Sequence, residues 1–173
     1  SSLSNGVSTA KNLLLSEDVL AAVKAINKFG IKSTIKNNEC KIYGKGINGF
    51  KYKKNITINA KNSGTLGRLI LGFLINSPYE IKLIGDKSLS KRDFKRISDP
   101  LTKFGAKFSL TEKKNLPLKI CGSNNLNSII YFEKKGSAQV KSAVMFGAMR
   151  SEGTTFIKAK KSRNHTELLC KYL

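Results

Sequence analysis

The sequence predicts an α/β fold, built from a unit of strand, helix, strand, helix, strand and strand that repeats along the chain. Two observations support this prediction. Similar segments recur 75 residues apart, as in Lys28-Phe29-Gly30 and Lys103-Phe104-Gly105. Within each copy, segments with apolar residues at helical spacing alternate with short segments typical of strands.

The first predicted helix covers residues 18–32. Its apolar residues fall at helical spacing, Ser16 is placed to cap its start, and Gly30 is placed to end it. Residues 94–107 repeat this design. A hairpin of short strands is expected after each glycine, over residues 32–36 and 40–43 in the first copy and 107–110 and 118–121 in the second.

The other half of the unit also occurs twice. It begins with an apolar helix that contains an internal glycine, Gly72 or Gly147. Each helix is followed by a strand and then by the start of another helix, which carries an arginine, Arg92 or Arg163. The helices are expected over residues 65–74 and 137–149, and the strands over 80–84 and 154–159.

Compared with this unit, both ends of the chain are expected to be incomplete. Residues 1–6 resemble the tail of the apolar helix and its loop, and a last helix over 164–173 stops where the earlier copies reach Phe-Gly. We therefore expect residues 1–173 to form a single partial domain of about two and a half units, truncated at both ends.

The composition restricts the class of protein. A hydrophobic share of 40% over 173 residues is typical of a globular chain, and no apolar run reaches the roughly 20 residues of a membrane span. The net charge of +21 comes mostly from scattered lysines. We expect a solvated basic surface that attracts anionic substrates, with neither nucleic acid nor a membrane as partner.

The cysteines Cys40, Cys121 and Cys170 are odd in number and widely spaced, which is typical of a reducing compartment. We expect a cytoplasmic protein in which Cys40 and Cys121 are buried thiols. Because His165 is the single histidine, the sequence contains no Cys/His cluster and predicts no metal site.

Two segments place small or hydroxyl residues before a predicted helix and then supply an arginine. They are residues 62–68 (Asn-Ser-Gly-Thr-Leu-Gly-Arg) and 85–92 (Gly-Asp-Lys-Ser-Leu-Ser-Lys-Arg). The start of a helix presents unpaired N–H groups and partial positive charge, which suit phosphate and carboxylate groups. The two segments therefore predict a site for an anionic small molecule.

Four segments, in order, resemble the EPSP synthase (3-phosphoshikimate 1-carboxyvinyltransferase) family. They are Asn62-Ser63-Gly64-Thr65 with Arg68, residues 85–92 with Pro100-Leu101 and Gly105-Ala106, residues 137–143 (SAQVKSA) and residues 162–167 (SRNHTE). The resemblance runs over essentially the whole chain. It implies most of the N-terminal lobe of a two-lobed protein, each lobe an inside-out α/β barrel, with substrates bound between the lobes.

The resemblance also implies a reaction that needs no cofactor. The enolpyruvyl group of phosphoenolpyruvate moves to the 5-hydroxyl of shikimate 3-phosphate, through a tetrahedral intermediate and with release of phosphate. Arginine, lysine and backbone N–H groups are suited to hold the phosphates and carboxylates close together.

Matched by position, the resemblance assigns two sets of binding residues. Arg68 is expected to support its loop, and His165 to lie on a helix surface. The set for phosphoenolpyruvate is Gly64, Thr65, Arg92 and Gln139, and the set for shikimate 3-phosphate is Ser137, Ala138, Gln139, Ser162 and Arg163.

No catalytic residue is assigned to this chain. The family's Lys-Ser-x-Ser-x-Arg motif is expected before Ser1, and its acid/base carboxylates in the C-terminal lobe, which is the expected partner. We therefore expect the isolated chain to be inactive, because the cleft needs both lobes to close. Asp93 and Asn164 depart from the family's usual proline and aspartate, at expected helix starts that tolerate them.

Two alternatives stay open at this point. The first is the enzyme that transfers enolpyruvyl to UDP-N-acetylglucosamine, although its cysteine-bearing loop has no counterpart because no cysteine lies between residues 41 and 120. The second is a basic nucleic-acid-binding module of related repeat fold, as in RNA 3′-phosphate cyclases. Such a module would show a salt-dependent affinity for nucleic acid.

Overall fold

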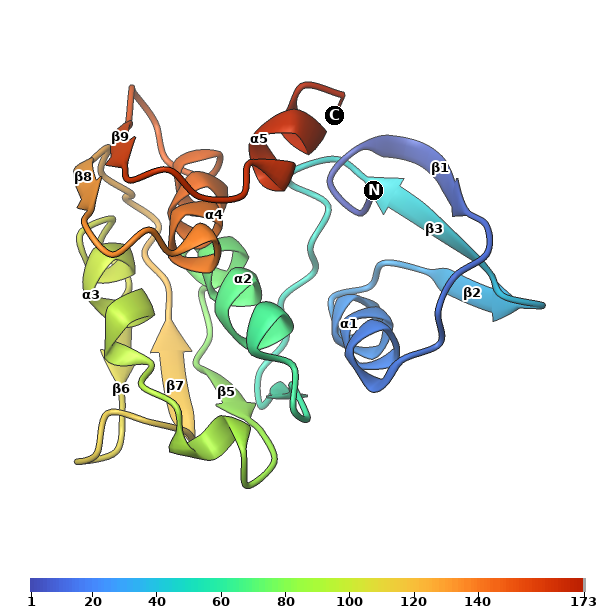
Figure 1. Ribbon diagram of the computed structural model, residues 1–173, viewed down its shortest axis with the longest axis horizontal. Helices are drawn as coiled ribbons and strands as arrows, with labels where there is room; N and C mark the ends of the chain where they lie inside the picture. Colours follow the sequence, from blue (N-terminus) through green and yellow to red (C-terminus); the bar gives the residue numbers. More distant parts are fainter. Residues whose placement is uncertain (173) are drawn as a thin grey trace.

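A complete copy of the predicted unit lies in the middle of the chain in this computed structural model, which describes residues 1–172 (Figure 1). Its elements are β4 (Thr57–Asn59), α2 (Gly64–Leu74), β5 (Ile81–Ile84), the short 3-10 helix η1 (Leu89–Lys91), α3 (Lys95–Thr102), β6 (Lys107–Ser109) and β7 (Leu118–Cys121). They form a sheet of order β4-β5-β7-β6, in which β4 and β5 are parallel and the other pairs antiparallel. Because parallel strands need a crossover, α2 joins β4 to β5 across one face of the sheet.

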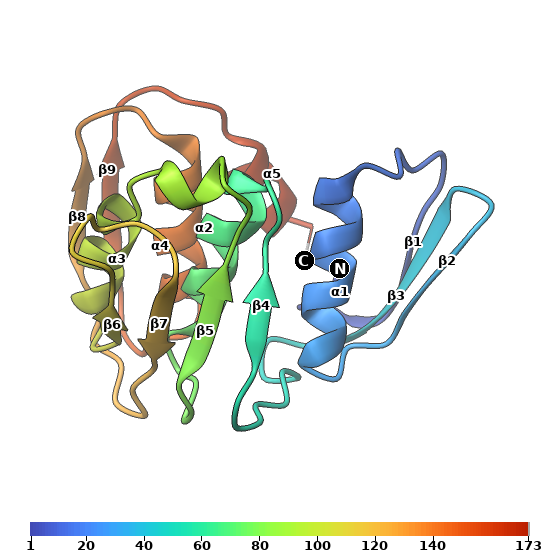
Figure 2. The ribbon, with the colours of Figure 1, turned by 90° about the horizontal axis from the view of Figure 1, so that it is seen from below.

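Elements in the same order as parts of this unit flank it on both sides. Before it come β1 (Asn5–Ala10), α1 (Glu17–Lys28), β2 (Ser33–Lys36) and β3 (Glu39–Lys45), with an antiparallel sheet of order β1-β3-β2. After it come β8 (Ile130–Glu133), α4 (Ala138–Ala148), β9 (Phe156–Ala159) and α5 (His165–Cys170), with β8 and β9 parallel. Figure 2 shows α2, α3 and α4 behind the strands of the central sheet, and α1 between β4 and the N-terminal sheet.

The helices begin at the serines that the sequence places there. Ser16 accepts a hydrogen bond from the Val19 N–H at 3.4 Å, and Ser63 accepts one from the Leu66 N–H at 3.1 Å. Each hydroxyl oxygen thus satisfies a donor that has no partner within the helix. At the other end of α1, Gly30 takes a φ of +77°, the left-handed conformation in which glycine commonly ends a helix.

The packing of α2 against α4 holds the centre of the molecule. A Cβ added to Gly72 of α2 would lie 2.2 Å from the Ala143 carbonyl oxygen of α4, so only glycine permits this approach. The rings of Phe73 and Phe146 stack beside it with centroids 4.2 Å apart. Because the helices lie this close, their first turns also come together, and the candidate site forms there.

Several expected boundaries were wrong. Residues 5 and 6, expected in a helix tail and loop, begin β1, because Asn5 pairs with Lys45 of β3. Helix α3 begins at Lys95, because the Asp93 carboxylate accepts a hydrogen bond from the Lys95 N–H at 2.7 Å. Arg92 therefore lies in extended backbone after η1, ahead of the helix start.

The C-terminal helix and one cysteine also differ from expectation. Helix α5 ends at Cys170, and the rest of the expected segment includes Leu173, which lies outside the described residues. Cys40 is buried as expected, whereas Cys121 is half-buried, because it ends β7 with its side chain turned from the core face. None of the helices among residues 1–172 has both the length and the apolar character to span a bilayer.

Candidate anion-binding site

The first turn of α2 carries two guanidinium groups against its backbone. A Cβ added to Gly64 would lie 2.8 Å from Nη1 of Arg92 and 2.9 Å from Nη1 of Arg68. Arg92 reaches this point from the end of η1, and Arg68 from the next turn of α2 itself. The absence of a side chain at Gly64 is therefore what lets both cations approach the helix start.

These two cations lack a carboxylate partner. Within residues 1–172, no aspartate or glutamate forms an ion pair with Arg68 or Arg92. Burial lowers the pKa of the Arg68 guanidinium, and the positive charges of Arg92 and Arg96 lower it further. The negative charge of Asp93 raises this pKa, but by less. Like charges at the positive end of a helix repel one another, so an anion bound between them would be stabilised.

Gln139 joins the first turn of α4 to this cluster. Arg68 Nη1 donates to Gln139 Oε1 at 2.7 Å, and Gln139 Nε2 donates to Thr65 Oγ1 at 2.9 Å. The Arg68 guanidinium also lies over the Phe94 ring, 5.6 Å from its centroid. Arg68 was expected to support its own loop; its hydrogen bond shows that it orients the Gln139 amide, 71 residues away in sequence.

A buried carboxylate shapes the loop that leads into α4. Glu133 is 6% exposed and accepts hydrogen bonds from the Lys135 N–H at 2.9 Å, the Ser137 N–H at 3.4 Å and the Tyr131 hydroxyl at 2.7 Å. Burial by itself would raise the pKa of Glu133. The hydrogen bonds and the charge of Arg96 outweigh burial and hold that pKa below its usual value. Glu133 therefore stays ionised and fixes the backbone that precedes the Ser137 cap.

A pocket of about 230 Å³ opens between α2, α4 and the start of α5. Four residues of the predicted sets line it: Thr65, Ala138, Gln139 and Arg163. The exposed His165 lies at its edge, on the helix surface as expected. The other predicted residues, Gly64, Arg92, Ser137 and Ser162, do not line this pocket.

The remaining predicted residues lie around the same two helix starts. Ser137 caps α4, and its oxygen accepts from the Val140 N–H at 3.3 Å, so the hydroxyl hydrogen stays available to a ligand. The Ser162 hydroxyl oxygen is buried and has no hydrogen-bond partner among the described residues. Arg163 next to it is exposed.

Sequence reasoning missed three polar residues that build this region: Glu133, Lys141 and Glu167. Lys141 is the single charged residue of α4, and a lone lysine in a mostly apolar helix was a usable signal, because a buried lysine needs a partner. No sequence signal pairs it with Glu167, which lies on another helix. For Glu133, the cue is weaker, since a carboxylate at the end of a strand is common.

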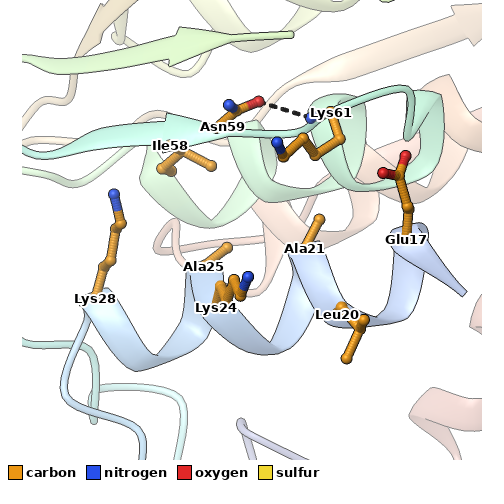
Figure 3. A pocket seen from close by; sticks show the side chains of 9 residues that line it. All are labelled: Glu17, Leu20, Ala21, Lys24, Ala25, Lys28, Ile58, Asn59 and Lys61. Atoms are coloured by element: carbon orange, nitrogen blue, oxygen red, sulfur yellow. Dashed lines mark hydrogen bonds between the residues drawn. The ribbon is translucent and has the colours of Figure 1, made fainter. Parts of the chain in front are cut away.

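A second groove, of about 310 Å³, lies between α1 and β4 (Figure 3). Lys28 of α1 reaches toward β4 and donates to the Thr57 carbonyl, and the Asn59 side chain accepts from the Lys61 backbone N–H at 2.9 Å. None of the predicted binding residues lines this groove. It is therefore not the candidate site.

Comparisons with known proteins agree with the resemblance seen in the sequence. The model of the family described as EPSP synthase (3-phosphoshikimate 1-carboxyvinyltransferase) matches residues 1–173. A 3-phosphoshikimate 1-carboxyvinyltransferase of Caldicellulosiruptor bescii is 41% identical over 173 residues, which are 99% of this chain and 40% of that protein. One from Streptococcus pyogenes serotype M4 is 40% identical over 167 residues, 95% of this chain and 39% of that protein.

The fold agrees as well. A solved structure of EPSP synthase from Acinetobacter baumannii superposes with a TM-score of 0.91 at 34% identity, over 98% of this chain and 39% of that one. The chain thus has the mixed α/β fold of that enzyme. It spans about 40% of the length of the curated relatives that it matches.

Proposed function

The chain belongs to the EPSP synthase family, and from this premise we propose that it supplies one half of a site for phosphoenolpyruvate and shikimate 3-phosphate. In this proposal Gly64, Thr65 and Arg92 contact phosphoenolpyruvate, and Gln139 contacts both substrates. The contacts to shikimate 3-phosphate come from Ser137, Ala138, Ser162 and Arg163.

The convergence of Arg68 and Arg92 on Gly64 carries the phosphoenolpyruvate half of the proposal. Two guanidinium groups, which have no carboxylate partner in the described part of the chain, face the start of a helix, where backbone N–H groups also favour an anion. A ligand with a phosphate and a carboxylate is suited to this position, since each planar guanidinium can donate two parallel hydrogen bonds to either group.

Three observations support the shikimate 3-phosphate half. Ser137 keeps a free hydroxyl hydrogen at the start of α4, the buried Ser162 hydroxyl lacks a partner within residues 1–172, and the Arg163 side chain is exposed beside the pocket. The Gln139 amide donates to Thr65 and lines the same pocket as Arg163. Gln139 can therefore contact both ligands at once.

The enolpyruvyl transfer itself we propose for the assembled protein. There, the 5-hydroxyl of shikimate 3-phosphate adds to phosphoenolpyruvate, and phosphate leaves. This chain would bind and orient both substrates and would offset their mutual repulsion with preorganised positive charge. We assign it no proton-transfer residue and expect no turnover from the isolated chain.

The finer form of the fold is also a proposal: an inside-out α/β barrel lobe completed by a third inner helix. An apolar groove of about 340 Å³ runs between α1 and α2, with Val19 and Ile26 on one side, Leu69 and Phe73 on the other, and Phe146 of α4 at its end. The occupant we propose is a helix equivalent to α2 and α4, from the part of the relatives' length outside the matched region. Co-expression with that segment is expected to raise the free energy of unfolding, and an unchanged stability would refute this occupant.

A titration followed by amide chemical shifts tests the half-site, because it detects weak binding residue by residue. We expect phosphoenolpyruvate to shift the amides of Gly64 and Thr65, and shikimate 3-phosphate those of Ser137 and Arg163. The variant Arg92→Gln keeps the length of the side chain and is expected to abolish the first response. The matched control Lys82→Gln removes an exposed charge on the outer face of β5.

Nonspecific attraction to a basic chain is the alternative outcome. If amide shifts appear at lysines over the whole surface, and inorganic sulfate produces them equally well, the proposal is contradicted. Tight binding of transfer RNA that weakens steeply with salt, without a response to either substrate, would favour the nucleic-acid module.

A further inference from the structure

We propose that Lys141 and Glu167 are positioning residues, which fasten the segment carrying Ser162 and Arg163 onto α4 and so set the affinity of the shikimate 3-phosphate half of the site. This inference rests on the proposed function. It assigns a role to an ion pair that contributes no ligand contact of its own.

Lys141 is an ammonium buried inside the protein. Its side chain is 10% exposed, and it lies on α4 one turn after the Ser137 cap. It pairs with the Glu167 carboxylate and donates to the Arg163 carbonyl at 3.1 Å. A buried charge without partners is strongly unfavourable, so the position of Lys141 largely dictates where these two partners lie.

Helix α5 has little else to hold it. None of its residues is buried, and its large apolar residues Leu168 and Leu169 are 45% and 54% exposed. In residues 1–172, one further side-chain hydrogen bond joins α5 to α4, at 2.7 Å between the Ser142 and Thr166 hydroxyl groups. Among the described residues, polar ties rather than an apolar core therefore dock α5 and the segment before it.

The docked segment forms one wall of the candidate pocket. Arg163 and Thr166 line it opposite Thr65 and Gln139. Because Lys141 holds the Arg163 backbone, its loss would free that wall to move. The guanidinium cluster at Gly64 belongs to α2 and η1, which this tie does not touch. The proposal therefore predicts that the two ligands respond differently.

The test uses the chain of residues 1–173 and the variants Lys141→Met and Glu167→Gln. Methionine preserves the length and the burial of the side chain, and replacing a buried charge by an apolar group often leaves stability intact. We expect Lys141→Met to weaken shikimate 3-phosphate binding by about tenfold or more, the usual effect of losing a hydrogen bond to a charged group. Phosphoenolpyruvate binding is expected to stay unchanged.

Glu167→Gln leaves the bond from Lys141 to the Arg163 carbonyl in place, so a smaller loss is expected. The control is Lys119→Met, which breaks an exposed ion pair between β7 and Glu80, the residue just before β5. That variant is expected to bind both ligands as the parent chain does, because exposed pairs contribute little.

Amide hydrogen exchange supplies a readout that needs no ligand. In Lys141→Met, the Leu168 amide, which bonds to the Asn164 carbonyl, is expected to exchange about tenfold faster or more, while the Val144 amide in α4 keeps its rate. An unchanged Leu168 amide, or an equal loss of affinity for both ligands, would overturn the positioning role. If the parent chain binds neither ligand, the proposed function fails. The exchange rates then decide by themselves whether Lys141 holds α5 and the segment before it.

Discussion

Replacement of Gly64 by alanine should separate the stability of the fold from its affinity for anions. The added methyl group would lie 2.8 Å from Arg92 Nη1 and 2.9 Å from Arg68 Nη1, well inside a normal contact. Both atoms are ends of flexible side chains, so they can move aside without disturbing the backbone. Both guanidinium groups would then leave the position from which they face the start of α2.

The expected effects differ in size. Alanine is favoured over glycine within a helix by about 0.5–1 kcal/mol. This gain opposes the cost of weakening, without losing, the Arg68–Gln139 hydrogen bond, whose complete loss would cost about 1.5–3 kcal/mol because Arg68 is charged. The free energy of unfolding should therefore change by less than about 1 kcal/mol. Losing one hydrogen bond to a charged group corresponds to about 1.5–3 kcal/mol, so phosphoenolpyruvate affinity should fall by about 10- to 100-fold.

Urea denaturation and a titration with phosphoenolpyruvate measure the two quantities on the same samples. The matched control is Gly67→Ala, one turn along α2, whose methyl group would meet the Phe94 ring at an ordinary 3.4 Å and neither guanidinium. It should keep the affinity of the parent chain. If Gly64→Ala also binds as tightly as the parent chain, the two arginines do not form the anion site, and the reasoning fails.

Three further predictions concern packing, pH and thiol reactivity. Gly72→Ala should lower the free energy of unfolding by about 3 kcal/mol in urea denaturation, because its methyl group would meet the Ala143 carbonyl oxygen at 2.2 Å, and a near-parent stability would show that the helices separate freely. The lowered pKa of Glu133, which faces Tyr131 and Arg96, implies stabilisation that is complete above the ordinary glutamate pKa of about 4.3 and lost as the pH falls further. Glu133→Gln should therefore destabilise the chain more at pH 7 than at pH 3, and an equal effect at both values would contradict this. Cys40 is 3% exposed, and burial raises the pKa of its thiol, so it should react slowly in the native state. In a variant with Cys121→Ser and Cys170→Ser, denaturation should speed its reaction with a thiol reagent by more than about tenfold. Equal rates would mean that the thiol is accessible in the native state.

Elements governed by neighbours in the chain could be predicted from the sequence. Ser16 and Ser63 cap the helices that follow them, and Gly30 ends α1, because each of these interactions joins residues at most a few positions apart. The repeat was visible for the same reason, since each unit carries its own periodicity and turns. The boundary at Asn5 was missed, because pairing with the distant strand β3 decided it. The boundary at Lys95 depends on a contact with Asp93 two residues away, so it was open to prediction from the sequence.

The site divides in the same way. Its segments were found from their helix starts, but their contacts were not, because those contacts join positions 71 to 74 residues apart. The approach of α2 and α4 at Gly72 brings Arg68 and Thr65 within reach of Gln139. Lys141 and Glu167 likewise meet only in the folded chain, where α5 lies against α4.

The sequence by itself determined the repeat, the helix starts and the residues available to bind anions, because local hydrogen bonding and periodicity specify them. The tertiary structure alone decided that two arginines share the space beside Gly64 and that a buried lysine holds the backbone of Arg163. The physical reason is that such contacts depend on the distance between packed helices and on the directions of their side chains, which no local pattern encodes.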